Sequence, residues 1–150
     1  AYFEKYPGIK DYMDRMEKQA LKKHYVTSLF GRKRRFPLVT PDQVWKIRNQ
    51  AANMPDQSTA GDFTLWSIVN LFDELYHQYG DKCKIINTVH DSILFIIHES
   101  ILDEALRLIT DTMTSVPVDT KGVPIEVDVD LGDNLGELYG YQDYKTLHVS

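Results

Sequence analysis

The sequence of 150 residues predicts an α+β domain in which a small antiparallel sheet with a central hairpin packs against several helices. Three observations support this fold class: helical spacing of apolar residues in three segments, two adjacent β-rich runs, and one segment of strict alternation. A chain of this length buries about 70% of its unfolded surface, so its core needs no disulfide. The single cysteine, Cys83, could form none within the chain.

The N-terminal segment, residues 3–24, is predicted to be helical because its apolar residues recur at three- and four-residue steps between charges. Pro7 suits the first turn of the second part of this helix. Residues 25–30 are β-branched and aromatic, and Gly31 closes them. They predict a short extended piece or one arm of a hairpin.

Pro37 and Pro41 bracket a predicted loop. Thr40 before Pro41 indicates a helix start, with a hydroxyl cap followed by proline at the first helical position. This helix is expected to run to about Ala52, and residues 53–55 are expected to interrupt or restart it.

A long helix is predicted from about residue 56 to residue 79, before Gly80 ends it. Its apolar positions nearly surround the helix, which predicts burial on more than one side. A further helix is expected from a Ser100 cap to about Met113.

Two β-rich runs, residues 83–88 and 93–98, are predicted to pair as a hairpin through residues 89–92. Residues 123–131 alternate apolar with polar side chains, which predicts a half-buried antiparallel strand.

The net charge of −5 hides an asymmetry. Residues 1–50 hold 12 Lys and Arg against 5 Asp and Glu, whereas residues 51–150 hold 5 against 17. The positive balance of residues 1–50 suggests a surface that faces a polyanion. Charges distributed by chance over solvated faces would give the same counts. No apolar run approaches the roughly 20 residues that span a bilayer, and the N-terminus has no signal-peptide layout. We therefore expect no membrane association, and a reducing compartment.

Three short segments could carry chemistry. The pair His90–Asp91 lies at the predicted hairpin turn, where it either forms the turn or presents a carboxylate to a hard cation such as Mg²⁺. The run Arg32, Lys33, Arg34 and Arg35 is either a solvated face or a phosphate-binding patch. Asn53 and Gln57 could reach acceptors in a minor groove, or Asn53 and Ser58 could simply cap helices.

The order of these segments resembles the C-terminal part of family A DNA polymerases, the bacterial DNA polymerase I family and its phage relatives. The resemblance covers about residues 2–138. It rests on Phe30-Gly31-Arg32 with the following cations, on Asn53-Met54-Pro55 with Gln57, Thr59, Ala60 and Asp62, and on Val89-His90-Asp91.

The resemblance implies that residues 1–150 are a C-terminal part of a polymerase palm and fingers region. Asp91 would bind the two Mg²⁺ ions of nucleotidyl transfer, shared with an aspartate that this chain lacks, and His90 would lie near the primer terminus. The cations from Arg32 to Arg35 would hold the primer–template backbone. Asn53 and Gln57 would contact the minor groove near the new base pair.

Four positions depart from the family pattern. Ser92 replaces a glutamate, Ser58 replaces a glycine, and Gly61 replaces an alanine. Asn49 stands where an arginine is usual, with Arg48 one residue before it. The resemblance also implies a second metal-binding aspartate and a triphosphate-binding fingers helix, and nothing in this chain substitutes for either. We therefore expect a fragment of a polymerase, one subunit of a split polymerase completed by its N-terminal part, or a remnant with a binding role.

The resemblance implies primer–template DNA and dNTPs as the partners, and the cytoplasm of a bacterium or phage-infected host, or an organelle, as the location. Two other functions stay open on the sequence. Ser92 would also suit a single-subunit RNA polymerase, and a non-catalytic DNA-binding or assembly module would need no metal.

Overall fold

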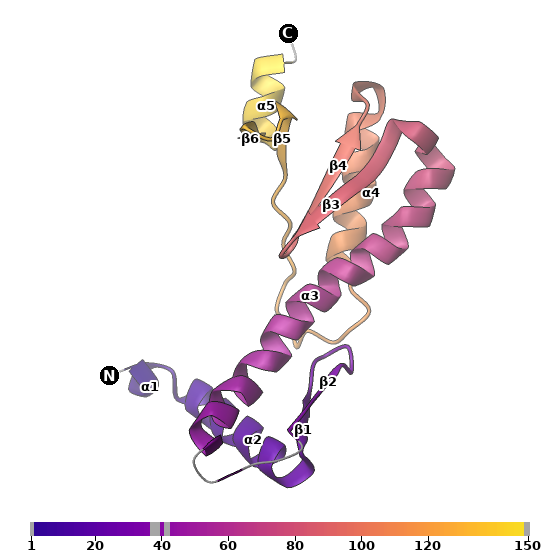
Figure 1. The fold of residues 1–150 in the computed structure, drawn as a ribbon. Helices are drawn as coiled ribbons and strands as arrows, with labels where there is room; N and C mark the ends of the chain where they lie inside the picture. Colours follow the sequence, from indigo (N-terminus) through magenta and orange to yellow (C-terminus); the bar gives the residue numbers. More distant parts are fainter. Residues whose placement is uncertain (1, 37–39, 41–42, 149–150) are drawn as a thin grey trace.

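A single 36-residue helix, α3 (Val44–Tyr79), runs between two groups of elements that lie at its opposite ends. The computed structural model shown in Figure 1 describes residues 2–36, 40 and 43–148. The order of helices and small antiparallel sheets confirms the predicted α+β class.

The first group packs on the N-terminal end of α3. It consists of α1 (Tyr2–Lys5), α2 (Pro7–Lys23) and a hairpin of β1 (Tyr25–Thr27) with β2 (Lys33–Arg35). The predicted helix and hairpin arm are thus confirmed, with Pro7 in the first turn of α2. The core of this group consists of small and medium apolar residues, namely Ala20, Val26, Phe36, Ile47 and Ala51.

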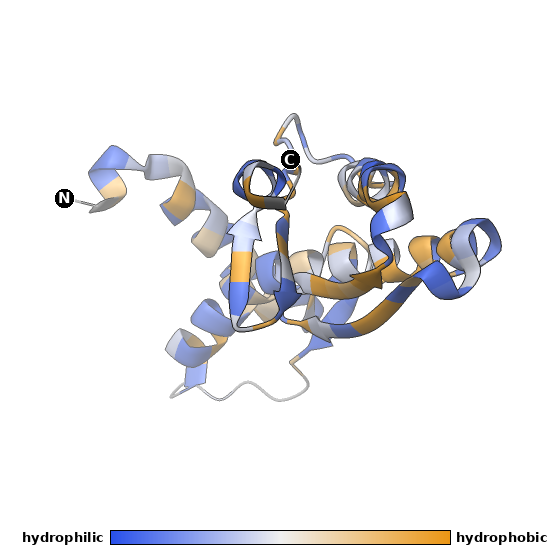
Figure 2. Ribbon diagram, turned by 90° about the horizontal axis from the view of Figure 1, so that it is seen from above, coloured by the Kyte–Doolittle hydropathy of each residue, from blue (hydrophilic) through white to orange (hydrophobic). Residues whose placement is uncertain are grey.

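The second group packs on the C-terminal end of α3, which the short helix η2 (Gly80–Lys82) joins to the central hairpin. The hairpin pairs β3 (Cys83–Val89) with β4 (Ser92–Ile97), and α4 (Leu102–Thr114) covers it together with α3. Hydrophobic residues are prominent along this hairpin and the helices that pack on it (Figure 2). The core of the group consists of Leu71, Leu75, Cys83, Ala105 and Ile109.

The C-terminal elements form a smaller unit, in which β5 (Asp130–Asn134) pairs with β6 (Glu137–Gly140) and α5 (Tyr141–His148) follows. Polar contacts hold it to α4: the Tyr141 hydroxyl donates to Asp103 at 3.0 Å and the Lys145 ammonium donates to the same carboxylate at 2.8 Å. The predicted strand at 123–131 reaches only the first two residues of β5, and neither β6 nor α5 was predicted, because the segment is short, polar and rich in glycine.

The predicted break at residues 53–55 is wrong, since α3 is continuous through Pro55. Proline removes one backbone donor from a helix and leaves the carbonyl four residues earlier, here that of Ala51, without its usual partner. The next carbonyl, that of Ala52, accepts a 3.0 Å hydrogen bond from the Tyr12 hydroxyl of α2. Packing against α2 therefore stabilises the helix where the sequence alone disfavours it. Burial and the nearby Asp56 carboxylate raise the pKa of Tyr12 to about 12.

The prediction that the second half of α3 is buried on more than one side is also wrong for this chain. Leu71 and Leu75 are buried, but Val69 and Phe72 are exposed. The side of the helix that faces the hairpin is covered, and the neighbouring apolar side is open.

Two further expectations are corrected in the C-terminal half. The short helix η3 (Glu99–Ile101) precedes α4, and His98 rather than Ser100 supplies the cap, with its Nδ1 accepting from the Ser100 amide at 3.1 Å. The predicted strand at 123–131 is paired only from Asp130 onward. Residues 123–129 keep an alternation of half-buried and exposed side chains, but they form no ladder with the described residues.

The predicted loop bracketed by Pro37 and Pro41 lies largely outside the described residues. Within the described part of the chain, no helix has the length and apolar character needed to cross a membrane.

Truncating Leu71 to alanine should lower the free energy of unfolding by about 2–5 kcal/mol, because its fully buried side chain leaves a cavity in the second core. The matched control is Asn70→Ala, at an exposed position next to it, which should change stability by no more than about 0.5 kcal/mol. Urea unfolding followed by circular dichroism measures both. Equal effects would contradict the assignment of the buried side of α3.

Candidate catalytic turn and nucleic-acid interface

The central hairpin turns through only two residues, His90 and Asp91, because Val89 pairs directly with Ser92. His90 has a φ of 56°, in the left-handed region that a residue with a Cβ rarely adopts. Such backbone conformations persist where the surroundings fix them, and they cluster at functional sites. The turn leaves the Asp91 side chain exposed at the tip of two apolar strands.

Hydrogen bonds fix this turn from two sides. Within the hairpin, the Ser92 hydroxyl donates to the Val89 carbonyl at 2.8 Å, and the Thr88 hydroxyl donates to the Ser92 carbonyl at 2.9 Å. From α3, the Thr64 hydroxyl lies 3.4 Å from the backbone carbonyl of Asp91 and equally far from that of Ala60 in its own helix, so the two carbonyls share one donor. These bonds engage the backbone around Asp91, so its carboxylate stays available to a ligand.

A buried carboxylate on α3, that of Asp62, anchors the loop of the first hairpin. One of its oxygens accepts from the Arg32 guanidinium through Nε at 2.9 Å and also through Nη2. The other oxygen accepts from the hydroxyls of Ser28 at 3.1 Å and Ser58 at 3.4 Å. Gly31, at a φ of 84°, supplies the left-handed residue that this tight loop needs.

The Arg32 guanidinium is the largest cause that lowers the pKa of Asp62, and the serine hydroxyls add to it, while burial opposes them. The carboxylate is therefore ionised at neutral pH although its side chain is almost fully buried. Arg32 is accordingly a residue that holds the loop, and any contact that it makes with DNA stays a prediction.

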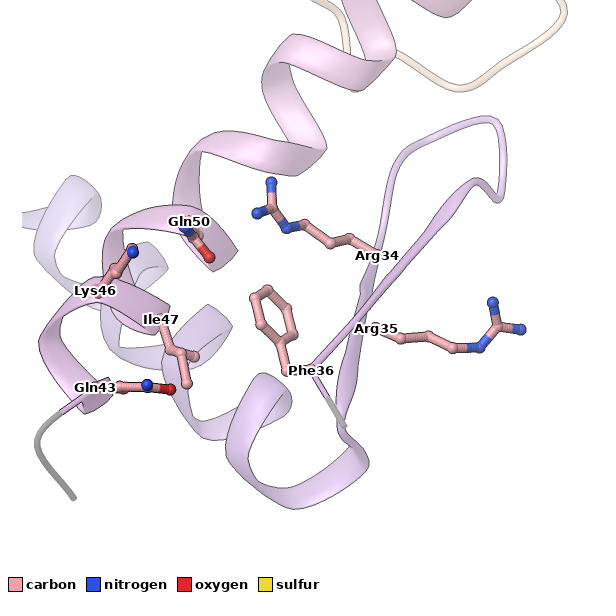
Figure 3. A pocket seen from close by; sticks show the side chains of 7 residues that line it. All are labelled: Arg34, Arg35, Phe36, Gln43, Lys46, Ile47 and Gln50. Carbon is pink, nitrogen blue, oxygen red and sulfur yellow. The ribbon is translucent and has the colours of Figure 1, made fainter. Parts of the chain in front are cut away.

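The remaining cations of the run point in different directions, because β2 alternates its side chains between two faces. Arg34 points toward α3 and Arg35 points away from it (Figure 3). The Lys33 ammonium lies 4.9 Å from the centre of the Tyr25 ring. The cations of the predicted basic patch therefore lie on one exposed strand but do not all face the same way.

Arg34 lines a cavity of about 230 Å³ between β2 and the start of α3. Lys46, Gln43 and Gln50 also line this cavity (Figure 3). Sequence reasoning missed Lys46 and Gln50. Their four-residue spacing, in register with Asn53 and Gln57, was the signal that could have found them.

Lys46, Gln50, Asn53, Gln57 and Thr64 lie on one side of α3, since they follow one another at steps of three, four or seven residues. Asn53 and Gln57 are exposed, and their proposed contact with DNA stays a prediction. Thr64, at the end of this polar stripe, is the residue that contacts the Asp91 carbonyl. The helix face that carries Asn53 and Gln57 therefore leads, through the buried Thr64, to the turn that carries Asp91.

Arg48 does not extend this stripe. Its Nη2 lies 2.6 Å from an Asp14 carboxylate oxygen and its Nε lies 3.5 Å from one of Glu17, both on α2. It ties α2 to α3.

The metal chemistry expected of Asp91 needs more ligands than this surface provides. An exposed carboxylate oxygen suits Mg²⁺, which prefers hard oxygen ligands. Among the described residues, however, no group of three or more His, Cys, Asp or Glu side chains could hold a metal ion. The exposed Asp91 carboxylate could supply one oxygen ligand to such a site, and the metal-ligand role of Asp91 stays a prediction.

The sequence profile described as DNA polymerase family A matches residues 1–137. DNA polymerase I of Streptococcus pneumoniae serotype 4 is 35% identical over 116 residues, which are 75% of this chain and 13% of that protein. DNA polymerase I of Rhizobium leguminosarum is 28% identical over 144 residues, 92% of this chain and 14% of that protein. The chain therefore spans about a seventh of the length of these relatives.

The fold of this chain is also similar to part of a solved polymerase structure. The POL domain of Pol1 from M. smegmatis, in complex with DNA primer-template and dNTP, superposes with a TM-score of 0.73 at 29% identity. The likeness covers 83% of this chain and 22% of that one.

Replacing Asp62 with asparagine should destabilise the protein by about 1–3 kcal/mol at pH 7, because the neutral amide pairs poorly with Arg32 and with the buried Ser28 hydroxyl. The lowered pKa of Asp62 stabilises the folded state above the ordinary aspartate pKa near 4, and this contribution is lost as the pH falls through the folded value. The difference in the free energy of unfolding between the wild type and Asp62→Asn should therefore become smaller below about pH 4. Urea unfolding from pH 3 to pH 7 measures it, with the exposed Asp128→Asn as control. A deficit that does not change with pH would contradict the ionised pair.

Proposed function

Because this chain belongs to DNA polymerase family A, we propose that residues 1–150 form a C-terminal part of a polymerase palm and adjoining fingers, and that they serve template-directed extension of a DNA primer from dNTPs. The relatives that it matches are several times longer. The activity is therefore proposed for the completed polymerase, in which other polypeptide supplies the groups that this chain lacks.

The observation that carries the proposal is the junction between Thr64 and the Asp91 turn. Eleven residues separate Asn53 from Thr64, which is about 17 Å along a helix. This length matches roughly five nucleotide steps of a DNA strand at about 3.4 Å each. A duplex lying along α3 would thus present its minor groove to Asn53 and Gln57 while its primer end reaches the turn.

Asp91 is proposed as the one carboxylate that this chain contributes to a Mg²⁺ site, completed by an aspartate of the remaining polymerase. When bound, the ions would activate the primer hydroxyl and balance the charge of the triphosphate. The chain's own part in this chemistry is to hold the carboxylate rigidly, through the short turn and the Thr64 contact. His90, the other residue of the turn, is proposed to lie beside the primer terminus.

The exposed cations of β2 are proposed to hold the phosphate backbone. Arg34, with Lys46 across the cavity, places positive charge beside the polar stripe of α3, and Lys33 and Arg35 extend it on the other face of the strand. Arg32 contributes by fixing the hairpin to α3 through Asp62. Asn53 and Gln57 offer both donors and acceptors, which suits the acceptors that every base pair presents in the minor groove.

Asp91→Asn should lower primer extension by the completed polymerase at least about a hundredfold, because the neutral amide removes a charged metal ligand. Binding of primer–template DNA should change little, since the substitution leaves the helix stripe and β2 untouched. A primer-extension assay with Mg²⁺ and dNTPs gives the first value, and fluorescence anisotropy with labelled DNA gives the second.

Asp128→Asn serves as the matched control, because this exposed carboxylate lies outside the turn. Full activity of Asp91→Asn, or an equal loss of extension and of binding, would be inconsistent with a metal-ligand role. Extension with rNTPs and without a primer would point instead to an RNA polymerase.

Neutralising Arg34 and Arg35 together as glutamines should weaken DNA binding and flatten its dependence on salt, with the slope of log K against log salt falling by up to about two. Anisotropy titrations between low and high salt measure this slope. The control is Lys121→Gln, a cation in the turn that precedes residue 123. An unchanged slope would mean that Arg34 and Arg35 belong to a solvated face only.

A further inference from the structure

The two residues proposed to meet the minor groove, Asn53 and Gln57, lie on either side of the proline inside α3. Pro55 has no backbone N–H, so the carbonyl of Ala51 lacks its usual donor within the helix. The proline ring also crowds the preceding turn, and proline is a common cause of bends in helices. The turn that carries Asn53 and Gln57 therefore has fewer hydrogen bonds of its own than an uninterrupted helix would supply.

A tyrosine of α2, which packs against α3, contacts this turn from outside the helix (Figure 1). The Tyr12 hydroxyl donates to the carbonyl of Ala52 at 3.0 Å and lies 3.5 Å from a carboxylate oxygen of Asp56. Because a hydroxyl has one hydrogen, the shorter distance assigns the bond to Ala52. Ala52 and Asp56 immediately precede Asn53 and Gln57 in the chain. Tyr12 thus contacts α3 one residue before each member of the pair.

Two further contacts fix the place from which Tyr12 acts. The Arg15 guanidinium, also on α2, lies 5.8 Å from the centre of the Tyr12 ring. Arg48 of α3, four residues before Ala52, pairs with acidic side chains of α2. Charged groups therefore hold α2 against α3 one turn before the residue that accepts from Tyr12.

The Tyr12 hydroxyl keeps its proton at neutral pH. Burial and, after it, the Asp56 carboxylate raise the pKa of Tyr12 to about 12. A neutral phenol donates a hydrogen bond, whereas a phenolate could only accept one. The bond to the Ala52 carbonyl therefore persists under the conditions in which DNA is bound.

We propose that Tyr12 is a positioning residue for DNA binding: by bonding the Ala52 carbonyl, it holds the turn around Pro55 so that Asn53 and Gln57 face the minor groove together. The inference rests on the proposed function, in which these two side chains meet DNA. It adds a residue of another helix that acts through the backbone of α3.

The benefit of such a contact is preorganisation. Residues four positions apart share one face of a helix only while the turn between them is regular. Freedom that two side chains lose when they bind a ligand lowers the affinity. Holding the backbone beside Asn53 and Gln57 removes part of this loss before DNA arrives.

A double-mutant cycle on DNA binding tests the inference with the polymerase as it exists, purified natively from its source through a tag on this chain. Tyr12→Phe removes the hydroxyl and keeps the ring. A pair variant, Asn53→Ala with Gln57→Ala, removes both side chains that Tyr12 is proposed to position. Fluorescence anisotropy with labelled primer–template DNA gives the dissociation constants of the wild type, Tyr12→Phe, the pair variant and their combination.

We expect the pair variant to weaken binding at least about tenfold and Tyr12→Phe to weaken it about threefold. Adding Tyr12→Phe to the pair variant should cause no further loss, because absent side chains gain nothing from being positioned. In a second cycle, with Arg34→Gln on β2, the two losses should multiply, since that contact lies on another element. Losses that multiply in both cycles would overturn the inference, because a general effect on folding acts on every contact alike.

Tyr139→Phe is the matched control, because it removes a tyrosine hydroxyl from β6, outside α2 and α3. A loss of binding as large as that of Tyr12→Phe would overturn the inference. Circular dichroism checks that each variant is folded. If Tyr12→Phe fails to fold, Tyr12→Met repeats both cycles, because methionine also lacks the hydroxyl and adapts to irregular space.

The pair variant separates this inference from the proposed function. Weaker binding by the pair variant, with losses that multiply when Tyr12→Phe is added, would leave the DNA interface standing and remove the role of Tyr12. Wild-type affinity in the pair variant would remove the proposed minor-groove contact and the role of Tyr12 with it.

Discussion

The Asp62 carboxylate, buried on α3, is the point on which the arrangement of the first half of the molecule depends. It accepts from Arg32, Ser28 and Ser58, so one side chain joins the hairpin loop to the helix at several atoms. A buried carboxylate is tolerated only when charged and polar donors surround it in this way. The same hydrogen bonds therefore fix the position of the hairpin loop on α3. Because the loop is held, β2 lies where Arg34 faces Lys46 and Gln50 across one cavity. The cationic strand and the polar stripe of α3 are therefore presented together.

The turn at His90 and Asp91 is built in the opposite way. The main-chain carbonyls around Asp91 lie within hydrogen-bond distance of the hydroxyls of Thr64, Thr88 and Ser92. The Asp91 carboxylate, in contrast, is exposed to solvent. A rigid presentation of one ligand is what a shared metal site requires from each contributor. In the proposed polymerase, this chain would supply the surface along which DNA lies and one carboxylate at its end, while the remaining ligands would come from elsewhere.

Local patterns in the sequence predicted the parts of the fold that depend on local order. The spacing of apolar residues in residues 3–24 correctly predicted α2. The apolar runs on either side of His90–Asp91 correctly predicted the central hairpin. The break at Pro55 was wrong because Tyr12 and the α2 packing support the helix there, which a linear sequence does not display. Strand pairing at 123–129 was wrong because alternation predicts a pleated surface but not the presence of a neighbouring strand. For the site, residue types predicted roles for Asp91, Asn53 and Gln57 that stay predictions. The contact of Arg32 with Asp62 could not be predicted, because the two residues are distant in the sequence.

The two cores are gathered at opposite ends of α3 and share no residue. Between them the buried residues of the helix are polar: Thr59, Asp62, Thr64 and Ser67. Apolar burial is the main source of cooperative unfolding, so each end of the helix forms a unit that opens with its own free energy. Amide hydrogens at the two ends of α3 would then exchange with solvent through separate opening events.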